Sequence, residues 1–138
     1  MAGELRVEFT VQRFIRRPPA DVFAAVADPV QLCRYFTATA APALAAGVSA
    51  RWTWAGGDAA DVHVTACEPP ARIEFHWEAC RVSHETQVRM TFAAESGGTR
   101  VAVHETGWQP DDAGLQSSYA HCAGWQEMLD HLRAWLEH

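Results

Sequence analysis

The sequence predicts an α+β fold in which a curved, six-stranded antiparallel sheet wraps around one long carboxy-terminal helix. Three observations indicate this fold. Six stretches alternate apolar and polar side chains, as strands with one buried face do. Turn residues divide the last five stretches at intervals of about ten residues, which favours antiparallel hairpins. In the final segment, large apolar side chains recur every three or four positions, which is a helical spacing.

Composition limits the classes of protein that the chain can belong to. Its 138 residues suit one domain, residues 1–138, and six tryptophans with 49% hydrophobic residues exclude disorder. A formal net charge of −6 argues against nucleic acid or an anionic membrane as partner. No apolar run approaches the ~20 residues that cross a bilayer. The four scattered cysteines and the absence of a signal peptide predict free thiols in the cytoplasm.

The first third of the chain predicts one strand and two short helices. Residues 5–15 alternate, with Leu5, Val7, Phe9, Val11 and Ile15 on the apolar face. After a proline break, residues 20–27 form a short helix with Phe23 and Val26 inward, which Asp28 and Pro29 end. Further helical turns are expected over residues 30–36, and a loop over residues 37–47.

The middle of the chain predicts the other strands of the sheet. They are expected at residues 48–55, 60–67, 72–78, 84–94 and 99–106. Glycine-rich turns at Gly56–Gly57 and Gly97–Gly98, and prolines at Pro69–Pro70, separate neighbouring strands. Each strand has one apolar face, so something must cover the sheet, and only the last segment is large enough.

That segment, residues 111–138, predicts one long amphipathic helix. Asp111 and Asp112 suit its first turn, where a carboxylate caps free backbone N–H groups. The expected inward stripe is Leu115, Tyr119, Cys122, Trp125, Leu129, Leu132 and Leu136. Gly124 is unfavourable inside a helix by roughly 1 kcal/mol, so we expect close backbone packing beside Trp125. Cys122, small and central, indicates either an open space or a volume that Trp52, Trp54 or Trp77 already fills.

Polar residues in the inward register form one candidate site. Pairing the last two strands sets Phe92 near Val101 and Val88 near Glu105, so Glu105, Thr86 and His84 gather at one end of the inner face. Such a cluster predicts either a general acid and base or a contact for a polar ligand head. The alternative is that these groups are solvated at strand ends. The remaining histidines, including His121 and His131, are interpreted as surface residues without metal-site spacing.

Four stretches carry a resemblance to a known family. They are Pro18-Pro-Ala-Asp-Val-Phe, Glu68-Pro-Pro-Ala-Arg-Ile-Glu-Phe-His-Trp, Thr99-Arg-Val-Ala-Val-His-Glu-Thr-Gly-Trp and Gly124-Trp125 with its following leucines. With them the chain resembles the activator of heat-shock-protein-90 ATPase family, carboxy-terminal domain type. That family lies within the START-like helix-grip superfamily, which includes birch-pollen-allergen-like proteins. The resemblance implies the helix-grip form of the α+β fold and an internal pocket.

The function expected is binding of a small apolar or aromatic molecule between the sheet and the last helix, without cofactor or metal. The expected ligand-binding residues are Trp52, Trp54, Phe75, Trp77, Thr86, Met90, Phe92, Trp108, Tyr119 and Cys122. Two alternatives stay open: a chaperone-interacting module, and a cyclase or dehydratase using His84 or Glu105. The eukaryotic activator has a further amino-terminal domain for which 138 residues leave no room, so we expect no chaperone stimulation. A monomer and a homodimer are both compatible with the sequence.

Overall fold

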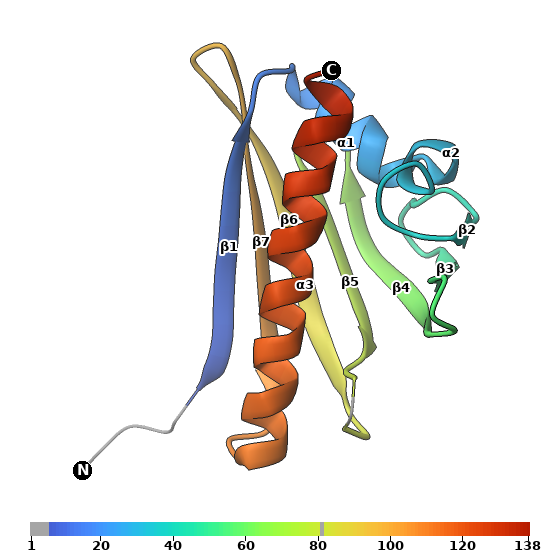
Figure 1. The fold of residues 1–138 in the computed structure, drawn as a ribbon, viewed down its shortest axis with the longest axis vertical. Coiled ribbons are helices and arrows are strands. Elements are labelled where there is room, and N and C mark those ends of the chain that lie inside the picture. Colours follow the sequence, from blue (N-terminus) through green and yellow to red (C-terminus); the bar gives the residue numbers. More distant parts are fainter. Residues whose placement is uncertain (1–5, 81) are drawn as a thin grey trace.

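The computed structural model describes residues 6–80 and 82–138 and confirms the α+β fold with one long helix across a curved antiparallel sheet (Figure 1). Within these residues the strand order is β1-β7-β6-β5-β4-β3-β2, all neighbours being antiparallel. The strands are β1 (Val7–Ile15), β2 (Thr39–Ala41), β3 (Ser49–Thr53), β4 (Ala59–Glu68), β5 (Arg72–Glu78), β6 (Glu85–Glu95) and β7 (Gly98–Trp108). The helices are α1 (Pro19–Ala27), α2 (Pro29–Leu32) and α3 (Asp112–Leu136).

The sheet has seven strands over the described residues, whereas the sequence predicted six. The additional strand, β2, lies within the segment expected to be a loop, and its three residues pair with β3, which makes β2 the edge strand. A strand this short shows no alternation that sequence reasoning can detect. The predicted inward position of Leu5 lies outside the described residues.

The two short helices follow one another because Asp28 serves both. It ends α1 in an extended conformation, and its side chain accepts a hydrogen bond from the Val30 N–H at 2.9 Å, capping α2. Phe23 and Val26 are buried as predicted. The second helix ends at Leu32, short of the expected residue 36, and turns complete the segment.

The long helix begins as predicted but presents a different face to the core. The Asp111 carboxylate accepts a hydrogen bond from the Gly114 N–H at 2.7 Å, which caps the first turn. Trp125 is buried, but Tyr119 is 58% exposed, so its inward assignment was wrong. At 3.6 residues per turn, Tyr119 lies about 120° around the helix from Trp125. The buried face consists of Gly114, Ser117, Ser118, Trp125, Met128, Leu129, Leu132 and Leu136.

The second half of α3 is attached to β1 and the segment after it. Arg13 Nε donates to the Asp130 carboxylate at 2.8 Å, and Arg17 donates to the Leu136 carbonyl at 2.9 Å. The Arg16 N–H donates to Glu137 at 3.0 Å. These bonds hold α3 against β1, which leaves its other flank turned toward β3, β4 and β5 (Figure 1). No helix in the described part of the chain is long and apolar enough to cross a membrane.

We predict that the hydrogen bond between Arg13 and Asp130 makes the free energy of unfolding depend on pH in the acidic range. The hydrogen bond from Arg13, aided by its charge, lowers the pKa of Asp130. A lowered pKa stabilises the fold at neutral pH, and this contribution is lost as the pH falls through it. Because the pair is half exposed, Asp130→Asn should cost less than about 1 kcal/mol at neutral pH.

The measurement is urea unfolding of both proteins at neutral and acidic pH. The difference between them should vanish in acid, whereas Glu127→Gln, an exposed change on the same helix, should have no effect at either pH. A difference that persists in acid would contradict an electrostatic role for Asp130.

Candidate functional site

A buried carboxylate lies at the centre of the candidate site. Glu105 is 0% exposed, and the described residues place four hydrogen-bond donors around it. Its Oε2 accepts from Trp77 Nε1 at 2.9 Å, Thr86 Oγ1 at 2.6 Å and His121 Nδ1 at 2.8 Å. Its Oε1 accepts from Trp125 Nε1 at 2.8 Å. A carboxylate without a proton acts only as an acceptor, and this donor set matches that form.

The register of the sheet brings these donors together. Glu105 faces Val88 across β6 and β7, as predicted, and Trp77 faces Thr86 across β5 and β6. Beyond Glu105 the pairing of β7 with β1 shifts by one residue, and Gly107 adopts a φ of 110°. Glycine tolerates this left-handed conformation, so β7 forms a bulge that turns Trp108 back to the inner face.

His121 was predicted to lie on the surface, and the structure corrects this interpretation. Its side chain is only 8% exposed. The Cys80 N–H donates to His121 Nε2 at 3.1 Å, so the neutral ring carries its proton on Nδ1, where it donates to Glu105. Ser117 Oγ donates to the Cys80 carbonyl at 2.6 Å. Two side chains of α3 therefore hold both backbone polar groups of Cys80.

The polar cluster predicted from the strands forms only in part. Thr86 bonds Glu105, but His84 takes no part, and its Nε2 is buried without a hydrogen-bond partner among the described residues. His121 occupies the position beside the carboxylate that was expected for His84. Among the described residues, no three His, Cys, Asp or Glu side chains are grouped to hold a metal ion.

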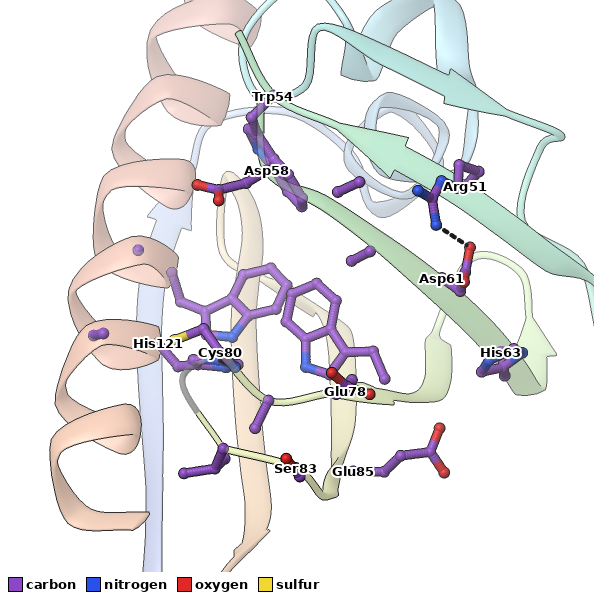
Figure 2. Close-up of a pocket in the computed structure, with 18 of the residues that line it drawn as sticks. Arg51, Trp54, Asp58, Asp61, His63, Glu78, Cys80, Ser83, Glu85 and His121 are labelled. Carbon is purple, nitrogen blue, oxygen red and sulfur yellow. Dashed lines mark hydrogen bonds and ion pairs between the residues drawn. The ribbon is translucent and has the colours of Figure 1, made fainter. Parts of the chain in front are cut away.

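A cavity of about 1040 Å³ lies beside this network, between α3 and strands β3 to β5 (Figure 2). Small-molecule sites are typically ~300–1,000 Å³, so the space suits a ligand. Its aromatic lining residues are Phe36, Trp54, Trp77, His63, His121 and Trp125. Its small lining residues are Ala59, Ala60, Ala79, Cys80, Ser83, Ala120 and Gly124, and Val82 also contributes. The charged lining residues are Arg51, Asp58, Asp61, Glu78 and Glu85.

Gly124 was predicted to allow close backbone packing, and this expectation was wrong. A Cβ placed on Gly124 would meet no atom of the described residues within 4 Å. Gly124 instead lines the cavity together with Ala120. The small size of this residue therefore leaves space open and serves no packing contact.

The structure locates the predicted ligand-binding residues in three settings. Trp54 and Trp77 line the cavity. Buried elsewhere are Trp52, Phe75, Thr86, Met90, Phe92 and Trp108. Tyr119 is exposed, and Cys122 is half-buried with its sulfur accepting from Gln126 Nε2 at 3.5 Å. On a helix, Cys122 and Gly124 lie about 160° apart, so the small residues of α3 that line the cavity are Ala120 and Gly124, and Cys122 is not among them.

We predict that the fold depends on the charge of Glu105. Glu105→Gln keeps the shape but turns an amide NH₂ toward existing donors, which leaves buried polar groups unpaired. The expected loss of unfolding free energy is about 3 kcal/mol or more. Thr86→Val removes one donor and should cost clearly less. Urea unfolding measures both, and a loss below about 1 kcal/mol for Glu105→Gln, the level of a surface change, would contradict the prediction.

Comparison with solved structures gives several close matches in fold. DynU16, from the dynemicin biosynthetic locus, is 25% identical with a TM-score of 0.85, covering 95% of this chain and 47% of that one. This chain thus spans about half of DynU16. Protein MLL2253 from Mesorhizobium loti is 19% identical, with a TM-score of 0.85 and coverage of 94% and 96%. The Aha1 dimer from Colwellia psychrerythraea is 20% identical, with a TM-score of 0.80 and coverage of 95% and 96%.

Comparison with curated proteins found no match. At these identities the Mesorhizobium and Colwellia structures show likeness of fold alone. The sequence profile described as "Activator of Hsp90 ATPase homolog 1-like protein" matches residues 16–137. Because this match covers nearly the whole chain, the protein belongs to the family of activator of Hsp90 ATPase homolog 1-like proteins.

Proposed function

We propose that this protein is a cytoplasmic binding protein for a small apolar or aromatic molecule, held between α3 and strands β3 to β5. The observation that carries the proposal is the presence of a glycine, Gly124, at a position of α3 that lines the cavity. A glycine inside an exposed helix is unfavourable by roughly 1 kcal/mol relative to alanine. No packing contact compensates here, since Gly124 is exposed, a Cβ placed on it would meet nothing within 4 Å, and the residue lines the cavity. A binding space that must stay open would explain why a glycine stands at this position of the helix.

The aromatic wall supports an apolar ligand. Trp77 and Trp125 stack with ring centroids 5.4 Å apart, and each directs its only polar group, the indole N–H, to Glu105. The surface that these indoles offer to the cavity is therefore ring carbon. Because their positions are fixed by buried hydrogen bonds, a ligand would bind without first ordering the wall, which favours affinity.

We predict that filling the space at Gly124 abolishes binding without unfolding the protein. Gly124→Leu places an isobutyl group in the cavity, where it meets no neighbour at its Cβ. Binding of the neutral fluorescent probe 1-N-phenylnaphthylamine should fall at least tenfold, about 1.4 kcal/mol, while the unfolding free energy should not fall.

Two variants serve as controls for this test. Ala123→Leu places the same side chain at an exposed neighbouring position that does not line the cavity, and it should bind the probe as the wild type does. Gly124→Ala should raise stability by about 1 kcal/mol. If the wild type binds no probe, or if Gly124→Leu binds as well as the wild type, the proposed function is wrong.

The family match favours a second candidate function, a module that acts on a chaperone ATPase. The Colwellia Aha1 protein is a dimer, which supports the homodimer among the two expected assemblies. We predict that adding this protein to the Hsp90 of its own organism leaves ATP turnover unchanged, with and without the apolar probe. A several-fold rise in turnover would favour the chaperone module over the binding protein.

A further inference from the structure

We propose that the cavity selects a positively charged aromatic molecule, such as one containing a quaternary or protonated ring nitrogen. This inference rests on the proposed function and adds the charge class of the ligand. It comes from two features that act together: the distribution of charge on the cavity wall, and the way in which the indoles are oriented.

The charged side chains on the described lining are mostly acidic. Arg51 is the basic one, and it pairs with Asp61 at 2.9 Å (Figure 2). Glu85 bonds His76 Nδ1 at 3.0 Å. Among the described residues Asp58 and Glu78 have no ion-pair partner, and Figure 2 shows them on different sides of the cavity. Low-dielectric walls concentrate the field of such charges within a recess.

The orientation of the indoles favours the same sign of charge. Trp77 and Trp125 line the cavity and give their N–H groups to Glu105, so neither indole presents its positive N–H edge to a ligand there. The face of an indole attracts cations. Behind these rings lies the buried Glu105 carboxylate itself, and both effects oppose an anionic ligand.

Three probes of nearly equal shape test this proposal: the cation N-methylquinolinium, neutral 1-methylnaphthalene and the anion 1-naphthoate. Isothermal titration of the full chain measures each dissociation constant at low and high salt. N-methylquinolinium should bind about tenfold or more tightly than 1-methylnaphthalene, and 1-naphthoate more weakly than either. Added salt should weaken binding of the cation and leave binding of the neutral probe nearly unchanged.

Variants assign the preference to named carboxylates. Asp58→Asn combined with Glu78→Gln should lower affinity for the cation about threefold or more and leave the neutral probe unaffected. Asp112→Asn, which removes one negative charge from the exposed first turn of α3, about three turns from Gly124, is the matched control and should change neither.

The outcomes separate this proposal from the proposed function. Equal binding of all three probes, or tighter binding of 1-naphthoate, overturns the charge selection and leaves an apolar binding protein. An unchanged cation preference in the double variant overturns the role of Asp58 and Glu78. If no probe binds, the proposed function fails and this inference fails with it.

Discussion

The fold depends on the burial of one carboxylate, that of Glu105, in a largely apolar interior. Removing a carboxylate from water costs several kcal/mol unless hydrogen bonds replace the lost solvation. Here the replacement comes from β5, β6 and α3, so that Trp77, Thr86, His121 and Trp125 all converge on the strand β7. The position of each donor side chain is fixed by its hydrogen bond to this carboxylate. Sheet and helix are thus joined by a directional contact, which apolar packing alone does not supply.

This contact also explains why α3 is asymmetric. With Trp125 and His121 committed to Glu105, the rotation of the helix about its axis is set, and one flank packs on the core. Ion pairing of Asp130 with Arg13 holds the same helix toward β1. The opposite flank, with Ala120 and Gly124, then faces a space that β3 to β5 do not fill. The cavity exists because α3 is bonded to β1 on one side and carries small residues, Ala120 and Gly124, on the side that faces β3 to β5.

Sequence reasoning found every strand except the three-residue β2, together with the β6 and β7 register and the inward position of Glu105, because alternation is clear in the longer, half-buried strands. Sequence reasoning failed on α3, because its inward-facing residues were chosen by the size of their side chains. Tyr119 was included for its bulk, whereas Ser117 and His121, which share the face of Trp125, were left out. An inward glutamate demands donors, and this signal favours His121 at the helical spacing of four from Trp125. The bonds between Cys80, His121 and Ser117 involve backbone groups of a loop, which no residue pattern reveals.

The loop held by those bonds connects the buried network around Glu105 with the cavity. Glu78 follows Trp77 directly and Cys80 comes two residues later, so the acidic wall of the cavity continues from the strand that supplies a donor to Glu105. His121 reaches both sides at once, with Nδ1 on Glu105 and Nε2 on the Cys80 N–H. A ligand in the cavity would therefore touch groups whose positions the buried network fixes. Since a molecule that binds only the folded chain stabilises it by mass action, occupancy of the cavity would reinforce the arrangement around Glu105 that keeps its aromatic wall in place.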